Sequence, residues 1–423
     1  MQQEEGHEVS LLWPGRIKVI SSAISILESS SEYNIKSYEM VNPLPVPLLN
    51  GINDVNLYIK KGDLKFFEEW IKKERPDVIH IHTLMGLYQE FVEAAVKANI
   101  KIVYTSHDYF GLCPKVNLFD GQESCSGSDL RKCKSCCSTA LSRWKVFFLQ
   151  SRVYRHFKDT AVVQQIRKKE HQKKEHPSDE KQANKNLDEH LYDKLRKYYL
   201  NIFSMISLFH FNSRTAYGIY NHFFSIKQYK ILPITHKEIR DNRVKKEFTG
   251  KLKIAYLGPC SRHKGFYELK NILDELFYSK KEFILNIYNE PHENAEYFKI
   301  HKSYSYSQLY EVFGESDVLI VPSKWYETFG FVVLEALSFG VPVILSDKVG
   351  AKDLICQEEE MGFVFKNKME LKEIISDLYS DRKILERWNK NIVCSPRLLF
   401  NMSDHERLIM DLYCHEGKSM DED

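Results

Sequence analysis

The chain has no run of about eighteen apolar residues, the length that a membrane-spanning helix needs, so we expect no transmembrane segment. It has no large excess of either charge, because 60 Lys and Arg residues face 58 Asp and Glu residues and leave a net charge of +2. A nucleic-acid partner bound through a strongly basic surface is therefore not expected. The start, Met1 to Gly6, is acidic and polar and does not resemble a secretory signal.

Close cysteine pairs are also scarce. The nine cysteines are an odd number and several stand alone, so without a secretory signal we expect reduced thiols in the cytoplasm. Peripheral contact with the inner face of the membrane is the alternative location. The remaining composition, 43% apolar and 28% charged over 423 residues, is ordinary for a soluble globular protein of two or three domains.

Short apolar strands alternate with helical stretches, which is typical of parallel α/β units. The strands that the pattern predicts are 8–14, 35–40, 77–82, 101–106, 206–212 and 230–233 in the first half, and 253–257, 283–288, 318–321 and 341–345 in the second. The predicted helices include 63–74, 87–98, 331–339 and 404–414. The two series join at a polar stretch near 239–250, so we predict domains at residues 1–240 and 241–400, followed by a C-terminal helix within 401–423.

The most informative stretch runs from Ser323 to Glu335 and reads Ser-Lys-Trp-Tyr-Glu-Thr-Phe-Gly-Phe-Val-Val-Leu-Glu. It joins an apolar strand to an apolar helix, and a glycine-containing turn in that place points free backbone N–H groups at an anion. Glu327 lies at the mouth of the turn, and Glu335 lies about two helical turns further on, near the same helix face. These donors and acceptors suit a sugar attached to a nucleotide diphosphate. The alternative is a buried helix with two incidental glutamates.

A second loop offers a cation. Lys264 and Gly265 lie between the strand at 253–257 and a helical pattern that runs to Leu276. A cation in a glycine-containing loop before a helix can neutralise a diphosphate leaving group. The alternative is a surface lysine, which is the usual place for this residue type.

Histidines end two strands of the first half. His107 and Asp108 follow the strand at 101–106, where open α/β sheets bind ligands, although either residue alone is also consistent with a cap or turn. His80 and His82 alternate on one strand and therefore point the same way. That pair favours a structural or site-lining role over metal ligation.

Taken together, these motifs resemble glycosyltransferase family four, the large retaining family of group 1 glycosyltransferases with a GT-B fold. The resemblance covers most of the chain in the expected order and rests on Val321 to Ser323, Glu327, Phe329-Gly330, Glu335-Ala336, 340–343, 353–355, Leu257-Gly258, Lys264-Gly265, 77–82 and 105–108.

The resemblance implies an α/β GT-B fold, with two doubly wound Rossmann-like domains facing an interdomain cleft and a last helix that crosses back to the first domain. It implies that Glu327 binds donor-sugar hydroxyls and that His107 approaches the donor sugar and the acceptor, which makes these two the catalytic candidates. It also implies that the donor is held by Arg262, Lys264, Thr328, Phe329, Gly330, Phe331 and Glu335, with Glu335 at the ribose.

The sequence departs from the family in three places. Pro259 stands where an Arg usually follows the glycine of the diphosphate loop, and Arg262 is the substitute from the same loop. The run 347–351 lacks the usual pair of glycines. The opening, Met1 to Val9, reads as the end of a first helix and the second strand, so a strand and a glycine-rich turn of about thirty residues are expected before it.

Two further stretches carry competing interpretations. Cys113, Cys125, Cys133 and Cys136, in a loop that spans 113–137, have spacing suited to a structural zinc site, and free thiols or a disulfide are the alternatives. Residues 166–197 are rich in Lys, Glu, Gln, Asn and His and are expected to form a solvated insertion. The alternative for that insertion is a basic edge that meets anionic lipid.

We therefore expect a glycosyltransferase that moves a sugar with retention from a nucleotide-diphosphate donor to a carbohydrate or lipid-linked acceptor, in cell-surface polysaccharide or glycoconjugate synthesis. No cofactor besides the donor and no divalent metal are expected, because Lys264 and the helix N-terminus can stabilise the leaving diphosphate. One competing function is an inactive homologue that serves as a partner or chaperone subunit, which the absent first strand motivates. Another is a sugar-nucleotide epimerase, which would need acid and base residues beyond His107.

Overall fold

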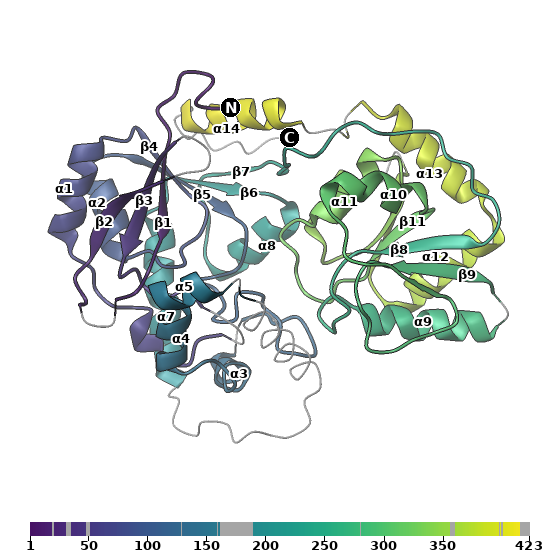
Figure 1. Ribbon diagram of the computed structural model, residues 1–423, viewed down its shortest axis with the longest axis horizontal. Helices are drawn as coiled ribbons and strands as arrows, with labels where there is room; N and C mark the ends of the chain where they lie inside the picture. Colours follow the sequence, from purple (N-terminus) through teal and green to yellow (C-terminus); the bar gives the residue numbers. More distant parts are fainter. Residues whose placement is uncertain are drawn as a thin grey trace.

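The computed structural model describes residues 1–18, 21–30, 35–47, 51–127, 129–158, 160, 189–279, 281–355, 360–396, 398 and 401–414. Within these residues the chain forms three β-sheets, two in a first part and one in a second part that lies beside it (Figure 1). No helix of the described part is both long and apolar enough to cross a membrane. The charged insertion predicted at 166–197 falls outside the described residues, except for 189–197, which begin a helix.

The first part holds a mixed sheet and a parallel sheet. The mixed sheet has the order β1-β3-β2, in which β3 pairs parallel with β1 and antiparallel with β2. The parallel sheet has the order β4-β5-β6-β7. The strands are β1 (Ser10–Pro14), β2 (Ser25–Ser29), β3 (Lys36–Val41), β4 (Val78–Ile81), β5 (Lys101–Ser106), β6 (Leu208–Phe211) and β7 (Tyr229–Ile231).

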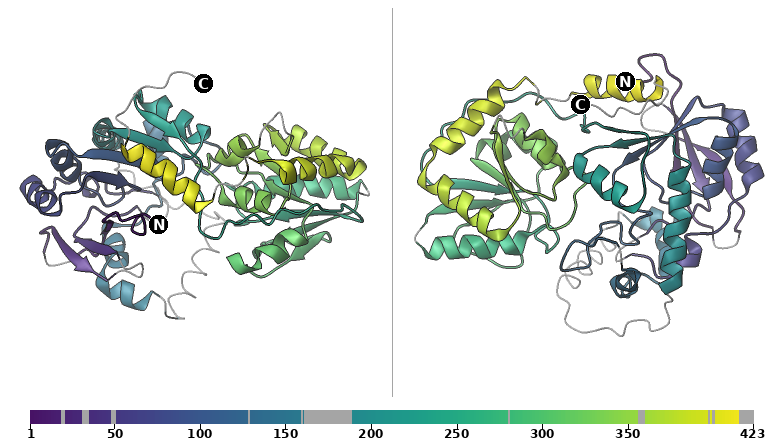
Figure 2. Two further views of the ribbon diagram at one scale, coloured as in Figure 1. Left: turned by 90° about the horizontal axis from the view of Figure 1, so that it is seen from above. Right: turned by 180° about the vertical axis from the view of Figure 1, so that it is seen from behind.

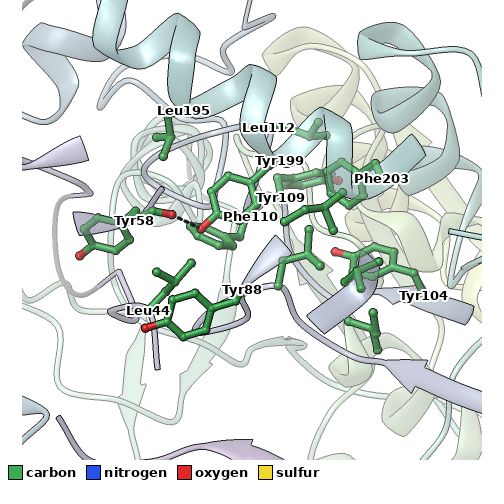
Figure 3. Close-up of a cluster of buried hydrophobic side chains, with 14 of the residues drawn as sticks. Leu44, Tyr58, Tyr88, Tyr104, Tyr109, Phe110, Leu112, Leu195, Tyr199 and Phe203 are labelled. Atoms are coloured by element: carbon green, nitrogen blue, oxygen red, sulfur yellow. Dashed lines mark hydrogen bonds between the residues drawn. The ribbon is translucent and has the colours of Figure 1, made fainter. Parts of the chain in front are cut away.

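An aromatic core holds the first part together (Figure 3). Tyr104, Tyr109, Phe110 and Phe203 are almost fully buried, and the hydroxyl of Tyr199 donates a 3.0 Å hydrogen bond to the Tyr58 carbonyl within the core. Buried aromatic rings of this kind contribute large apolar areas to stability. The helices around this core are α1 (Leu64–Glu74), α2 (Gln89–Lys97), α3 (Leu130–Cys136), α4 (Arg143–Leu149), α5 (Arg152–Phe157), α7 (Glu189–Ser204) and α8 (Arg214–Phe223), with the 3-10 helix η1 (Val55–Leu57).

The second part is one parallel sheet covered by helices on both faces. Its order is β10-β9-β8-β11-β12-β13. The strands are β8 (Leu252–Tyr256), β9 (Phe283–Ile287), β10 (Phe298–Ile300), β11 (Val318–Val321), β12 (Val343–Ser346) and β13 (Gly362–Phe365). The helices are α9 (Phe266–Tyr278), α10 (Leu309–Gly314), α11 (Phe331–Ser338), α12 (Lys368–Ser380) and α13 (Lys383–Cys394), with η2 (Tyr306–Gln308) and η3 (Gly350–Leu354).

Strand β11 shows why this sheet is buried on both faces. Val318 and Ile320 belong to the core beneath α9 and α12, whereas Leu319 and Val321 belong to the core beneath α11. Alternate residues of a strand point to opposite faces, so a continuous apolar run fills both cores. Pro322, the residue after β11, therefore emerges between two packed layers at the place where the glutamate turn begins.

The last helix, α14 (Met402–Cys414), lies on the first part, although α13 before it packs on the second (Figures 1 and 2). Its buried Ile409 and Leu412 pack with Val103 of β5 and Leu208 of β6. The chain thus crosses between its two parts twice, once before β8 and once before α14.

The structure differs from the predicted elements in a few places. It adds β2, β10 and β13, three strands of three to five residues that the sequence pattern does not reveal. It divides the first-half strands between two sheets, so that β1 and β4 are both edge strands. The antiparallel β2 is the exception to the expected parallel pairing.

Candidate functional site

Backbone hydrogen bonds hold the glutamate turn against the segment that follows β12. Glu327 pairs with Val349 as an isolated parallel bridge, in which Glu327 N donates to the Lys348 carbonyl at 3.1 Å and Gly350 N donates to the Glu327 carbonyl at 3.0 Å. Gly330, the residue before α11, has φ +110°, a left-handed conformation that favours glycine. A Cβ there would lie 3.4 Å from Glu327 Oε2, so the glycine also lets the carboxylate lie close to the helix N-terminus.

Glu327 is the centre of a buried polar group. Its residue exposure is 8%, and Oε1 accepts hydrogen bonds from Lys264 Nζ at 2.8 Å and from the Ser323 hydroxyl. Lys264 Nζ also lies 5.1 Å from the centre of the Trp325 ring, a cation–π distance. The two predicted residues Glu327 and Lys264 are therefore in contact. Ser323 and Trp325, which lie inside the motif but were not among the predicted site residues, join them.

Gly265 explains how Lys264 reaches this position. Its φ is +72°, and a Cβ would lie 1.8 Å from the Pro322 carbonyl oxygen at the end of β11. The loop before α9 therefore passes directly against the strand that leads to the turn, and Lys324 N donates to the His263 carbonyl at 2.9 Å. Arg262, predicted to assist Lys264, is exposed on the same loop.

The N-terminus of α11 offers backbone donors beside the carboxylate. Among the described residues, no acceptor bonds the N–H groups of Gly330, Phe331 and Val332, as expected for a first helical turn. The Phe329 side chain is buried at 3% exposure, so only its backbone can face a ligand. Such N–H groups and the positive end of the helix dipole favour phosphate or another anion.

Glu335 is buried in the next turn of α11, with 3% exposure. Burial raises its pKa to about 7, and within the described part of the chain Oε2 has no hydrogen-bond partner. The Oε1 atom of Glu335 lies 3.4 Å from Nε2 of His236. Burial lowers the pKa of His236, so the contact joins a largely neutral imidazole to a carboxyl group. The His236 ring lies 4.8 Å from Tyr306 and 5.2 Å from Phe331. Sequence reasoning missed His236 and Tyr306, which lie far from the motif along the chain.

His107 lies where the first part meets the glutamate turn. Its carbonyl accepts a 3.1 Å hydrogen bond from the Thr328 hydroxyl, and Ser213 donates to the Thr328 carbonyl at 2.6 Å. Ser124 likewise donates to the Lys324 carbonyl at 2.5 Å. The predicted residues His107 and Thr328 are thus brought together by the contact between the two parts.

The His107 ring is fixed by a second histidine. Its Nε2 lies 3.0 Å from Nδ1 of His82, and the two rings stack with centres 5.3 Å apart. Burial and the neighbouring His82 and His405 lower the pKa of His107 to about 4, so it is neutral near pH 7. The side chain of Asp108 accepts from Phe110 N at 2.7 Å, which supports the turn interpretation of that residue.

His80 belongs to a chain of hydrogen bonds whose directions can be derived. His210 Nε2 must donate to the Leu232 carbonyl, 2.8 Å away, so its neutral ring accepts at Nδ1 from the Thr105 hydroxyl at 2.9 Å. The Thr105 oxygen then accepts from His80 Nε2 at 2.6 Å, which leaves His80 Nδ1 to accept from the Tyr413 hydroxyl at 2.6 Å. This chain gives His80 a structural role, which agrees with the sequence prediction.

The cysteine loop shows no metal geometry. In the described residues, no group of three or more His, Cys, Asp or Glu side chains is arranged to hold a metal ion, and Cys113, Cys125, Cys133 and Cys136 are free thiols. Burial raises the pKa of Cys133 to about 12, so this thiol is neutral near pH 7. A zinc site at these cysteines stays a prediction.

Comparison with known proteins places the two parts in related families. Residues 1–155 match the family described as Glycosyltransferase Family 4, and residues 238–393 match the family described as Glycosyl transferases group 1. An uncharacterised 42.6 kDa protein in the cps region of Klebsiella pneumoniae is 24% identical over 312 residues, which are 73% of this chain and 66% of that relative. The matched part of the chain therefore spans slightly less than two thirds of the relative's length.

Two solved structures share the fold. Sucrose-phosphate synthase from Thermosynechococcus elongatus superposes with a TM-score of 0.56 and 14% identity, over 97% of this chain and 90% of that one. The Anabaena protein HepE, solved with UDP and glucose, superposes with a TM-score of 0.50 and 13% identity, over 91% and 88%. With two parallel sheets, the fold is that of the GT-B glycosyltransferases, and the chain belongs to glycosyltransferase family four, with its group 1 region in the second part.

Proposed function

We propose that the protein is a retaining glycosyltransferase that uses a nucleotide-diphosphate sugar as donor. One observation carries the proposal: the buried Glu327 carboxylate contacts Lys264 and Ser323 directly in front of the free N–H groups of α11. A cation and unpaired N–H groups suit a diphosphate, whereas carboxylate oxygens suit sugar hydroxyls. The two sets of groups lie on one turn, so a single ligand that carries both kinds of group fits them.

In this proposal Lys264 and the first turn of α11 stabilise the diphosphate as its charge grows in the transition state. Arg262 approaches from the same loop. Glu327 orients the donor sugar through its hydroxyls, and Glu335 accepts hydrogen bonds from the ribose. His107, neutral and held by His82, faces the sugar from the first part.

We propose the acceptor and the pathway from the relatives of the chain. Similarity to a protein in the cps region of Klebsiella pneumoniae supports a role in capsular or related cell-surface polysaccharide synthesis. The acceptor is then a carbohydrate or a lipid-linked carbohydrate. Because the related fold of HepE was solved with UDP and glucose, a UDP sugar is the first donor to test.

The test combines binding with turnover. The purified chain is incubated with UDP sugars and GDP sugars, with and without oligosaccharide or lipid-linked acceptors, while release of the nucleotide diphosphate and thermal stability are measured. We expect a thermal shift and release of the diphosphate, both reduced in Glu327→Gln, and a product with the anomeric configuration of the donor. A thermal shift without turnover would indicate an inactive partner subunit, and interconversion of donor sugars would indicate an epimerase.

A further inference from the structure

Helices α4 and α5 display large apolar side chains to solvent. Trp144 is 74% exposed, Phe148 56%, Val153 60% and Phe157 53%. The two helices lie side by side on the part of the molecule away from α14 (Figure 1). Four such side chains within fourteen residues form a patch rather than the scattered exposed residues of an ordinary surface.

The opposite face of these helices is fixed to the first part of the molecule. Val146 is buried. The side-chain amide of Gln150 makes two hydrogen bonds with the backbone of Val46: its Nε2 donates to the Val46 carbonyl at 2.8 Å, and its Oε1 accepts from the Val46 N–H at 3.1 Å. Arg155 contacts Glu39 at 3.1 Å and lies over the Trp13 ring. These anchors set the orientation of the helices, so Trp144 and its neighbours point outward from a fixed platform.

The charged side chains along the two helices have one sign, between Asp129 on one side and Asp159 on the other. Residues 130–158 contain eight Lys and Arg residues and no Asp or Glu, although the whole chain is nearly neutral. Arg143, Lys145, Arg152 and Lys158 are exposed on or next to the two helices that carry the apolar patch. Glu39, the acid that Arg155 contacts, is buried and is also paired with Arg16.

We propose that α4 and α5 form a docking surface for an anionic lipid membrane. Trp and Phe side chains enter the boundary between headgroups and acyl chains, whereas Lys and Arg side chains remain at the anionic headgroups. Each basic residue near an anionic surface strengthens binding by about fivefold at physiological salt. The coincidence of both features on one fixed face favours a membrane over a second protein, whose complementary acidic surface would have to be supplied separately. This surface lies outside the insertion at 166–197, for which a basic edge that meets anionic lipid was the alternative prediction.

The experiment measures vesicle binding of the full chain without any substrate, so its outcome does not depend on the proposed transfer activity. Co-sedimentation is compared between vesicles of phosphatidylcholine alone and vesicles with phosphatidylcholine and phosphatidylglycerol in equal parts. We expect binding to the anionic vesicles, little binding to the neutral ones, and weakening as salt rises. Tryptophan fluorescence should shift to the blue on binding, as Trp144 leaves water.

Two variants separate the contributions. The double variant Trp144→Ser with Phe148→Ser removes two apolar anchors, and we expect it to weaken vesicle binding at least tenfold. The double variant Arg143→Gln with Lys145→Gln removes two positive charges, and we expect it to weaken vesicle binding by about twenty-fivefold. The matched control is Tyr278→Ser with Tyr310→Ser, which removes exposed aromatics from the second part and should leave binding unchanged. Melting temperatures of all variants should match the parent, because Val146, Gln150 and Arg155 are kept.

Three outcomes would overturn the proposal. The first is absence of binding to anionic vesicles by the parent chain. The second is equal binding by the parent and both patch variants. The third is a dimer in light scattering that the patch variants dissolve, which would assign the surface to a second copy of the chain.

Discussion

The hydroxyl of Tyr413 on α14 lies 2.6 Å from Nδ1 of His80 on β4, although 333 residues separate the two along the chain. Beside them Lys101 Nζ donates to the Leu412 carbonyl at 2.6 Å. The last helix is therefore attached to the first part by directed hydrogen bonds as well as by its apolar face. Because α13 packs on the second part and α14 packs on the first, the C-terminal segment connects the two parts.

The Tyr413–His80 contact predicts the effect of removing one hydroxyl. In Tyr413→Phe the Nδ1 of the partly buried His80 loses its donor, and an acceptor left unpaired away from water costs about 1–3 kcal/mol of unfolding free energy. Urea unfolding should show this loss as a lower midpoint, with little change in the slope of the unfolding free energy against urea concentration. Tyr278→Phe, at an 84% exposed position, is the control and should be neutral. A Tyr413→Phe chain as stable as the parent would show that water replaces the hydroxyl at no cost.

The buried histidines predict sensitivity to mild acid. Burial lowers the pKa of His80 to about 2 and that of His210 to about 4, below the value of about 6.5 in an unfolded chain. Their stabilisation is therefore complete above pH 6.5 and is lost as pH falls, because only the unfolded state binds the protons; the loss ends near pH 4 for His210 and near pH 2 for His80. By pH 5 each histidine should cost about 2 kcal/mol of unfolding free energy.

The variant His210→Gln isolates this effect. It should be less stable than the parent at pH 7, since the bonds to Thr105 and Leu232 are disturbed, but its loss between pH 7 and pH 5 should be smaller by about 2 kcal/mol. Urea titrations at the two pH values measure both quantities. If the parent and the variant lose the same unfolding free energy between pH 7 and pH 5, His210 is protonated in the native state above pH 5.

The sequence predicted the second part better than the first. Val318 to Val321 and Val343 to Ser346 are central strands buried on both faces, so their apolar runs are continuous and their bounds agree closely with prediction. Edge strands β10 and β2 have alternating or exposed residues and little length, and no local pattern separates them from loops. The division of the first-half strands between two sheets depends on long-range pairing, which spacing along the chain does not reveal.

The candidate site shows the same limit. Glu327 and Lys264 were found because each lies in a glycine-containing loop between a strand and a helix, a local signal that the structure explains through Gly330 and Gly265. His236 carries no such signal, because it lies in an irregular stretch and reaches Glu335 only through the packing of the second part. Ser323 lay inside the motif, but its contact with Glu327 depends on the turn geometry.

Gly265 predicts a test of how the donor loop is held. In Gly265→Ala the new Cβ meets the Pro322 carbonyl, and φ +72° is unfavourable for alanine, so the loop must move and carry Lys264 away from Glu327. We expect donor turnover to fall at least tenfold and the chain to melt at lower temperature. The control is Gly218→Ala, in an open position inside α8, where alanine should stabilise by about 0.5–1 kcal/mol. Normal turnover in Gly265→Ala would mean that the position of this loop does not determine the rate of donor turnover.

Lys264 itself predicts a division between binding and turnover. Because the charge on the diphosphate grows in the transition state, Lys264→Ala should reduce turnover by about a hundredfold or more and ground-state affinity by much less. Calorimetry with the nucleotide diphosphate and steady-state kinetics with the sugar donor supply the two numbers. Lys227→Ala, an exposed lysine of the first part, is the control. Equal losses of turnover and of affinity would mean that Lys264 only binds the donor and does not stabilise the transition state further.

Glu335 predicts that donor binding releases a proton. Burial raises the pKa of the free carboxyl to about 7, so at pH 6.5 most molecules carry the proton. Ribose hydroxyls that donate to the carboxylate would favour its charged form and lower that pKa, so affinity should rise as pH increases through 6 to 7 and level off above it.

Calorimetry in buffers of different ionisation enthalpy measures the proton release directly. We expect a release of up to one proton per donor bound at pH 6.5, falling toward zero at pH 8.5. In Glu335→Gln this release should disappear, apart from protons lost by the ligand's own phosphate, and affinity at pH 8 should fall by about ten- to a hundredfold. If the variant binds every donor as tightly as the parent does and the proton count is unchanged, Glu335 does not contact the ligand, and its raised pKa reflects burial in the helix alone.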